Sequence, residues 1–417
     1  MLKPFNTALA TATVILSVGC ESISAPIPTG LDVAAHHVTL TAPGIPVPLA
    51  VTPRSGSDIL PASAARYVSR DTNTARVNDD GVVRAFDAGH TIIDVTAGGL
   101  TDTIGIDVVF DRPVWRFTLT GAISNVTANG LDAAGLRRNF QRHVDTVNAR
   151  FNVPAVFAGY VHFVVAETYV FTRPPKEELA EAPIRSDFKV VYHTDRTYQN
   201  ATFGSGGGRV AQIGALPDSA FTEQKAWVLT HELGHARGAA DIYGADVQPQ
   251  TNPVNGQTHF TPPSIMNGDE ARSWDDYSRY LINRAGSERD ALMHEGARTA
   301  EMVPAIAISV RRAAGDPVAD ATVRIHWDVC TDADRLIDRA CGIEPVPRQS
   351  LQTGSDGTVS VRPRNTGTFL EAFPLLQLVT ASKGASTGWA WVALTDIARW
   401  AIAHPDQVYP QTIVLAP

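Results

Sequence analysis

The chain has 417 residues, which is too long for one ordinary hydrophobic core and predicts two to four domains. Hydrophobic residues make up 44% and charged residues 19% of the sequence, which is typical of a globular protein and excludes a largely disordered one. The formal net charge of -8 argues against a nucleic-acid-binding protein, which would present a basic surface.

The first twenty residues have the features of an export signal. Lys3 supplies a positive charge, and the mostly apolar or small stretch from Ala8 to Val18 is too short to span a bilayer. Leu16 to Cys20 resembles the lipobox of bacterial lipoproteins, which implies that Cys20 carries a lipid anchor in the membrane of the cell envelope. The alternative is an ordinary secretory signal in which Cys20 has no role. Residues 21–30 are expected to form a tether.

Residues 31–110 are expected to form a β-sandwich. Short runs rich in β-branched residues alternate with turn signals such as Asp79-Asp80-Gly81. The stretch from Ser69 to Thr91 resembles the bacterial Ig-like domain, group 2. That resemblance implies a spacer or adhesion module, and none of these residues forms a pattern that indicates chemistry.

Residues 111–300 contain the elements expected of a catalytic domain. The spacing of apolar residues predicts an amphipathic helix over 131–151, in which His143 is expected to be a surface or partly buried residue. Runs 160–166 and 188–192 predict strands of a covered sheet, whereas residues 171–187 are typical of a solvated insertion.

Residues 231–241 read His-Glu-Leu-Gly-His-Ala-Arg-Gly-Ala-Ala-Asp, on a helix expected from about 222 to 237. His231 and His235 are four residues apart, so a helix presents both imidazoles on one face, where they can bind one Zn²⁺. Glu232 can then act on a zinc-bound water, Gly238 permits a left-handed turn, and Asp241 is a third ligand. The alternative is an exposed helix with two surface histidines. Mid-helix Gly234 indicates a close approach of neighbouring structure.

This spacing, followed by Ser264-Ile265-Met266, resembles the metzincin clan of zinc metallopeptidases, and specifically the snapalysin-like branch whose third ligand is Asp. The resemblance implies an α+β fold, Zn²⁺ as cofactor, a protein or peptide substrate, and an edge strand near 209–215 that binds the substrate. It also implies a tyrosine beyond the Met-turn, for which there are two candidates. The implied site is His231, His235 and Asp241 as zinc ligands, Glu232 as general base, Met266 beneath the metal, and Tyr277 or Tyr280 near it.

Two other residues can in principle replace Asp241 as the third ligand, because they lie in the loop between the two motifs. These are Asp246 and His259. Arg237 stands two residues after His235; a cation at a helix C-terminus is the simpler account of it, with a substrate-facing role as the alternative.

Residues 301–417 are expected to form a second β-sandwich. Two turn motifs, one of them Asp356-Gly357, resemble the regulatory-like modules attached to carboxypeptidases and other secreted enzymes. Trp389, Trp391 and Trp400 are expected to pack in its core, with a sugar-binding platform as the alternative. Export favours a disulfide between Cys330 and Cys341.

The predicted fold is therefore multidomain: an Ig-like sandwich, an α+β metzincin-like domain and a C-terminal sandwich. The predicted function is an exported, lipid-anchored zinc endopeptidase that does not bind nucleic acid. Two alternatives remain: a surface adhesion lipoprotein whose zinc site is vestigial or structural, and a zinc hydrolase that acts on another kind of bond. Glu232 favours the peptidase over the adhesion protein, because a structural zinc site needs no base.

Overall fold

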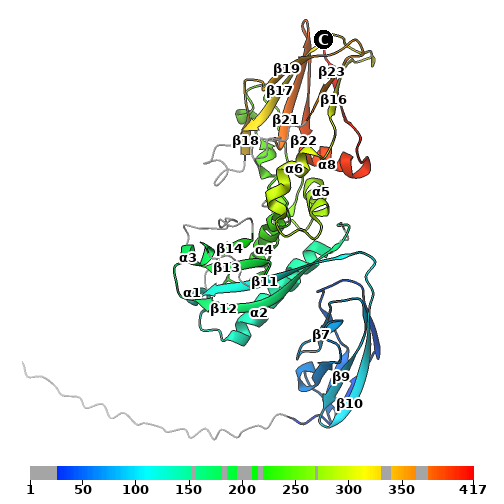
Figure 1. Cartoon of the computed structure of the whole chain (residues 1–417), viewed down its shortest axis with the longest axis vertical. Coiled ribbons are helices and arrows are strands. Elements are labelled where there is room, and N and C mark those ends of the chain that lie inside the picture. The colour runs from blue at the N-terminus through cyan, green and yellow to red at the C-terminus, as the bar shows by residue number, and fades with distance from the viewer. Residues whose placement is uncertain are drawn as a thin grey trace, which may run out of the picture.

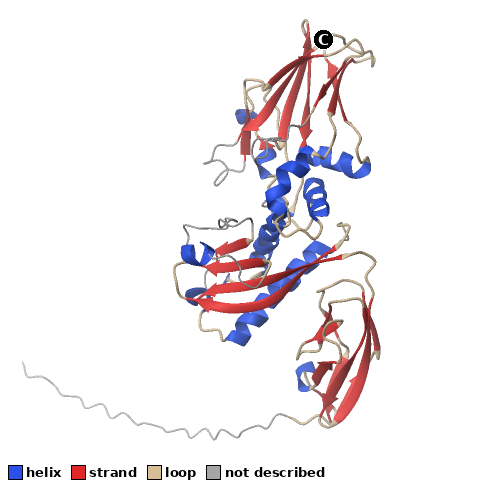
Figure 2. Cartoon of the chain, in the orientation of Figure 1, coloured by secondary structure: helices blue, strands red, loops and turns tan. Residues whose placement is uncertain are grey.

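The computed structural model describes residues 26–152, 156–180, 186–194, 209–214, 219–267, 271–329, 340–362 and 374–417. Within them the chain is a β-rich, multidomain protein with few helices (Figure 2). Figure 1 shows three units along the longest axis: an N-terminal β unit, a middle unit in which helices flank a sheet, and a C-terminal β unit. Cys341 is disulfide-bonded, but Cys20 and Cys330 lie outside the described residues, so the Cys330–Cys341 pairing stays a prediction.

The N-terminal unit consists of short strands around one core. Alternating burial along two neighbouring strands places Ile93, Ile104 and Ile106 in this core. The strand orders of its three sheets are β1-β4-β5, β2-β10-β9-β6 and β3-β8-β7. The elements are β1 (Gly30–Val33), β2 (His37–Leu40), β3 (Val47–Pro48), β4 (Val51–Ser55), β5 (Asp58–Ile59), η1 (Ala62–Ala64), β6 (Arg66–Ser69), β7 (Ala75–Val77), β8 (Val82–Ala85), β9 (Gly89–Ala97) and β10 (Leu100–Val108).

The sheet of the middle unit has the order β12-β11-β13-β14, and all three strand pairs are parallel. Helices α2 and α4 pack on one face and α3 packs on the other, so the strands are buried on both faces, as the β-branched and aromatic runs at 160–166 and 188–192 predicted. The elements are β11 (Val114–Ser124), α1 (Asn125–Ala128), α2 (Ala133–Asn152), β12 (Tyr160–Phe171), α3 (Pro175–Ala180), β13 (Phe188–His193) and β14 (Val210–Gly214).

Helix α2 forms where the sequence predicts it. Its apolar stripe is buried against the sheet, and His143 lies beside that stripe, three residues after Phe140 and four before Val147. The expectation of a surface or partly buried His143 is therefore wrong: the ring is buried, and its Nδ1 lies 2.9 Å from the Tyr192 hydroxyl. Burial lowers the pKa of His143 to about 4.

Residues 171–187 also differ from the sequence-based expectation. Glu178 on α3 is fully buried, where it accepts a 2.5 Å hydrogen bond from Arg173 Nε and pairs with Lys189 of β13. The described part of this segment is thus packed onto the sheet through a buried ion pair and is not a solvated insertion.

Helix α4 (Glu223–Ala236) carries the histidine motif and begins at Thr222, whose hydroxyl accepts from the Lys225 backbone amide. Gly238 ends the helix with φ of 88°, the left-handed conformation expected of a glycine there. The chain then continues through η4 (Tyr243–Ala245), β15 (Asp246–Val247), η5 (Pro249–Thr251), η6 (Ile265–Asn267), α5 (Asp276–Ala285), η7 (Ala291–His294) and α6 (Glu295–Ala300).

The C-terminal unit has two sheets around a core that the middle unit shares. One sheet has the order β15-β18-β17-β21-β22, with β19 also paired to β17, and the other has the order β20-β16-β23. Ile242, Tyr277 and Leu281 lie in the same core as Val303, so this core crosses the expected boundary at residue 300. The elements are β16 (Ile306–Arg312), β17 (Thr322–Val329), β18 (Ala340–Ile343), β19 (Gln349–Gln352), β20 (Thr358–Val361), β21 (Leu376–Lys383), β22 (Ser386–Ala393), α8 (Leu394–Ala403) and β23 (Tyr409–Leu415).

The predicted tryptophan packing holds only in part. Trp389 is 42% exposed, so the expectation that it lies in the core is wrong, whereas Trp391 and Trp400 are half-buried. Trp391 Nε1 donates to the Thr258 carbonyl at 3.1 Å, which joins β22 to the loop that follows the histidine motif. Gly357 has φ of 74°, which confirms the predicted turn.

Candidate metal centre

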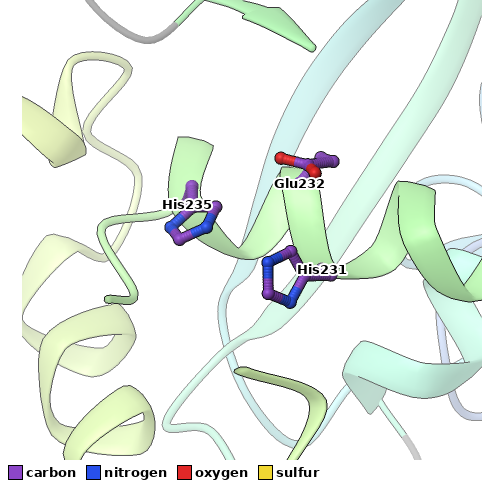
Figure 3. Close-up of side chains that lie close together, drawn as sticks. All are labelled: His231, Glu232 and His235. Atoms are coloured by element: carbon purple, nitrogen blue, oxygen red, sulfur yellow. The ribbon is translucent and has the colours of Figure 1, made fainter. Parts of the chain in front are cut away.

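The two motif histidines lie on consecutive turns of α4, and Figure 3 shows them together with Glu232. Their ring centroids are 4.9 Å apart. His231 Nδ1 lies 2.8 Å from the Ile265 carbonyl oxygen, and His235 Nδ1 lies 2.9 Å from the Ala239 carbonyl oxygen. Because a carbonyl oxygen only accepts, each Nδ1 donates to its carbonyl, and each Nε2 is left as the ring atom that can bind a metal once it is unprotonated. This is the arrangement in which imidazole binds a metal through Nε2.

Asp241 adds a carboxylate oxygen to the two imidazole nitrogens, which gives three candidate ligand atoms. Its Oδ1 lies 3.2 Å from His231 Nε2 and 3.3 Å from His235 Nε2. Burial opposes the carboxylate form of Asp241, but His235 and His231 outweigh it, so the pKa of Asp241 is lowered far below its ordinary value. The turn at Gly238 brings the chain back so that this carboxylate faces the helix.

Glu232 lies between the two histidines in sequence, and only 2% of it is exposed. One carboxylate oxygen comes within 4.8 Å of the ligand atoms of both histidines, while Oε2 is buried and has no hydrogen-bond partner among the described residues. Burial raises the pKa of Glu232 to about 8, with a smaller opposing effect of His231. A carboxyl group with a pKa near neutral is suited to accepting and returning a proton.

Met266 packs against α4 and explains Gly234. A Cβ atom at Gly234 would stand 2.8 Å from Met266 Sδ and 3.1 Å from the Trp274 ring, so α4 approaches η6 more closely than alanine permits. The close approach inferred from the mid-helix glycine is therefore confirmed. The Met266 carbonyl also accepts a 3.0 Å hydrogen bond from the Ile242 amide, which ties the turn to the segment that follows Asp241.

The turn that carries Met266 is held by α5. Ser264 Oγ donates to Asp275 Oδ2 at 2.6 Å and accepts from the Met266 amide at 3.1 Å. Asp275 is the N-cap of α5 and accepts from the Ser278 amide. Ser264 of the predicted Met-turn thus connects the turn to the start of the next helix.

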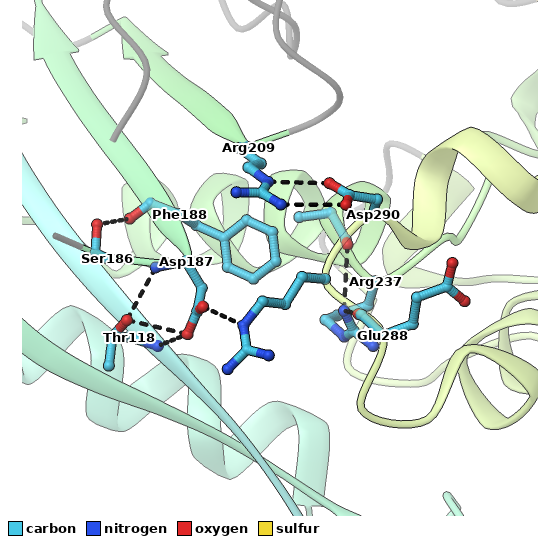
Figure 4. A network of polar contacts seen from close by, with 10 residues as sticks. Thr118, Ser186, Asp187, Phe188, Arg209, Arg237, Glu288 and Asp290 are labelled. Carbon is cyan, nitrogen blue, oxygen red and sulfur yellow. Dashed lines mark hydrogen bonds and ion pairs between the residues drawn. The ribbon is translucent and has the colours of Figure 1, made fainter. Parts of the chain in front are cut away.

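Arg237 is fully buried, so the interpretation as an ordinary helix C-terminal cation is incomplete (Figure 4). Its Nη2 donates to the Gly286 carbonyl at 2.6 Å, its Nη1 donates to the Glu288 carbonyl, and its Cζ lies 4.0 Å from the Phe117 ring centroid. Burial lowers the pKa of Arg237 to about 9. The guanidinium therefore anchors the end of α4 to the loop after α5.

The other residues considered from the sequence are engaged elsewhere. His259 Nδ1 donates to the Ala245 carbonyl at 2.8 Å, and Asp246 Oδ1 accepts from the Thr261 amide at 2.6 Å. The Tyr277 hydroxyl is buried beside Glu295 and Thr299, and Tyr280 is half-buried on α5. Strand β14, within the stretch expected to bind substrate, is an edge strand of the described sheet and pairs in parallel with β13.

Two residues near the centre were missed by the sequence analysis. The Tyr243 hydroxyl donates a 2.7 Å hydrogen bond to Asp241 Oδ2. Glu295 is 5% exposed, accepts from the Tyr277 hydroxyl at 3.0 Å, and has its pKa raised to about 8, chiefly by burial. Neither residue belongs to a spacing pattern, so only the folded chain identifies them.

The comparisons with known proteins leave the family open. No family model and no curated protein matches the chain. Among solved structures, domains 4 and 5 of the S-layer protein SbsC match at 21% identity over 20% of this chain and 54% of that chain, with a TM-score of 0.18. A GH10 xylanase from termite gut that contains a bacterial Ig-like domain matches at 23% identity over 24% of this chain and 26% of that chain, with a TM-score of 0.14.

A third solved structure, OgpA from Akkermansia muciniphila, matches at 8% identity over 69% of this chain and 95% of that chain, with a TM-score of 0.28. The chain spans about half the length of the S-layer structure named above. At these TM-scores the likenesses assign neither a fold nor a function to the chain. The site itself is therefore the basis for the functional argument.

Proposed function

We propose that the chain is an exported zinc-dependent endopeptidase whose middle unit is the metzincin-like α+β domain inferred from the motif. The observation that carries the proposal is that Asp241 Oδ1 lies 3.2 Å from His231 Nε2 and 3.3 Å from His235 Nε2, beside the buried carboxyl group of Glu232. In this proposal the N-terminal β unit is an Ig-like spacer and the C-terminal unit is a supporting sandwich.

The donor set fits Zn²⁺. Two imidazole nitrogens and one carboxylate oxygen form the type of three-ligand set that catalytic zinc sites use, because the fourth position stays open for substrate or water. Each imidazole has its Nδ1 held by a backbone carbonyl, which sets Nε2 toward the centre. Zinc bound there would polarise a peptide carbonyl and lower the pKa of a water molecule.

The residues of the chain then perform the proton transfers. Glu232 takes a proton from the water that attacks the scissile carbonyl and returns it to the leaving amine. Its burial keeps bulk water away from the proton during the transfer. Met266 and Gly234 keep α4 seated so that Glu232 and the two histidines retain their mutual positions.

Cleavage of casein and of a peptide library tests the proposal. The wild-type chain should bind one zinc ion and cleave, a chelator should abolish cleavage, and added zinc should restore it. Glu232→Gln should keep its zinc but lose about 10²–10⁴-fold in rate, as expected for loss of a general acid–base group. Glu223→Gln, which changes a mostly exposed glutamate on the same helix, is the matched control and should retain full activity.

The alternatives predict different results. Wild-type protein that holds one zinc ion yet cleaves no protein or peptide contradicts the proposal and favours the adhesion lipoprotein with a structural or vestigial site. Cleavage restricted to a non-peptide bond in a substrate screen favours the third class, a different zinc hydrolase.

The proposed location is the bacterial cell envelope, with the membrane reached through a lipid on Cys20. No helix in the described ranges is long and apolar enough to cross a bilayer. Metabolic labelling with a fatty acid tests the anchor: wild-type protein should take up label and Cys20→Ser should not. Unlabelled wild-type protein found in the medium would favour plain secretion.

A further inference from the structure

The zinc motif does not determine which carboxylate oxygen of Asp241 would face the metal. A carboxylate has two equivalent oxygens and turns about its terminal torsion, so it can meet a metal through either oxygen or through both. In the structure, Asp241 Oδ1 lies 3.2 Å and 3.3 Å from the two histidine Nε2 atoms, whereas Oδ2 points to another partner. Some group must therefore distinguish the two oxygens.

That partner is Tyr243, whose hydroxyl donates to Oδ2 at 2.7 Å. A hydrogen bond to a carboxylate is charge-assisted and stronger than one between neutral groups, so it fixes the rotation of Asp241. With Oδ2 bound to the phenol, Oδ1 alone remains directed between the two imidazoles. The arrangement parallels the one at each histidine, where a carbonyl at Nδ1 orients Nε2.

The position of Tyr243 is itself fixed from two sides. The preceding residue, Ile242, donates its amide to the Met266 carbonyl at 3.0 Å. The following strand β15 pairs with β18, so that Asp246 and Val247 stand opposite Ala340 and Cys341. The backbone on both sides of Tyr243 is thus held, by the turn at Met266 and by a sheet of the C-terminal unit, which limits how far the phenol can follow a rotating carboxylate.

We propose that Tyr243 is a positioning residue for the metal centre: it makes Asp241 a ligand through Oδ1 alone, and the C-terminal unit keeps Tyr243 in place. This inference rests on the proposed zinc site and deepens it. A single-oxygen ligand leaves the remaining coordination position free for substrate or water. Tyr243 acts through Asp241 and takes no part in proton transfer.

Zinc affinity of the full chain tests this role directly. Tyr243→Phe removes one hydroxyl and should weaken zinc binding about 10–100-fold in competition with a chromogenic chelator, the range typical of lost outer partners of metal ligands. Tyr160→Phe, which removes a hydroxyl that donates to the Asp111 carboxylate at 2.8 Å, should bind zinc like the wild type. In an Asp241→Asn background, Tyr243→Phe should have a much smaller effect, because the two residues act as one unit.

Replacement of zinc by Co²⁺ gives a readout that a purely structural role would not move. If Asp241 turns to bind through both oxygens in Tyr243→Phe, the coordination number rises and the visible absorption of the cobalt protein weakens.

Equal zinc affinity and an unchanged cobalt spectrum in Tyr243→Phe would overturn the proposal. Wild-type protein that binds zinc but cleaves nothing would defeat the peptidase function and leave the positioning role intact, whereas a wild type that binds no zinc would defeat both.

Discussion

Gly234→Ala tests the close packing of α4 against Met266 and Trp274, because two opposing effects predict opposite signs for the change in stability. In an open helix this substitution stabilises by about 1 kcal/mol, since alanine has the higher helix propensity. At Gly234 the new methyl group would stand 2.8 Å from Met266 Sδ and 3.1 Å from the Trp274 ring. Overpacking of a buried site costs about 1–3 kcal/mol. The net expectation is a loss of up to about 2 kcal/mol in the free energy of unfolding.

Urea unfolding of the metal-free protein measures this difference, and chelator competition measures zinc affinity. Zinc affinity should fall as well, because Ile265 next to Met266 supplies the carbonyl that orients His231. A stability gain of about 1 kcal/mol would refute the reasoning, since it would mean that the packing yields freely to the new methyl group.

A double-mutant cycle with Met266→Ala serves as the internal control. Met266→Ala alone should cost about 2–5 kcal/mol by leaving a cavity in a fully buried site. In the double variant the methyl group at position 234 occupies part of that cavity, so the combined loss should be smaller than the sum by about 0.5–3 kcal/mol. Strict additivity would show that the two positions do not contact each other.

Three further predictions follow from other parts of the structure. Burial lowers the pKa of His162 to about 3 from its ordinary 6.5, so the unfolded chain binds more protons than the folded one below pH 6.5. Between pH 7 and pH 5 the free energy of unfolding of the wild type should therefore fall by about 2 kcal/mol relative to that of His162→Gln, as measured by urea unfolding. Parallel pH curves for the two proteins would contradict this. Arg237→Met should leave the Gly286 and Glu288 carbonyls without their donor and cost about 2–6 kcal/mol in the same assay, against less than about 0.5 kcal/mol for exposed Arg312→Met. Removal of residues 301–417 should weaken the near-ultraviolet circular dichroism of the remaining chain and its zinc binding, because Ile242, Tyr277 and Leu281 would lose their core; a fragment with unchanged zinc affinity and an unchanged Tyr277 environment would refute the shared core.

Local sequence signals predicted the elements that carry the motif. The helix start near residue 222, the left-handed end at Gly238 and the close approach at Gly234 each depend on local backbone conformation or on the space beside one residue, and these are properties of short segments. The amphipathic stripe of α2 likewise follows from spacing alone. His143 was misjudged because only its residue type was weighed, although its position between Phe140 and Val147 places it beside the buried stripe.

Partners from distant segments could not be predicted in the same way. Glu178 lies in a charged, proline-containing stretch that is typical of an exposed loop, yet on α3 it is buried against Lys189 of strand β13. The shared core of the middle and C-terminal units has the same origin, because Ile242 and Val303 come together only through the tertiary fold. Spacing within the sequence contains no information on such pairs.

The proposed third ligand, Asp241, was only partly predictable from the sequence. The Gly-x-x-Asp spacing places a carboxylate where the chain returns to the helix, but the competing Asp246 and His259 lie in the same loop. In the structure both competitors are bound to the loop itself: Asp246 to the Thr261 amide and His259 to the Ala245 carbonyl. The two residues that the sequence offers as alternative ligands are thus engaged within the loop, whereas Asp241 faces the histidines. Replacing either of them should weaken zinc binding less than Asp241→Asn does.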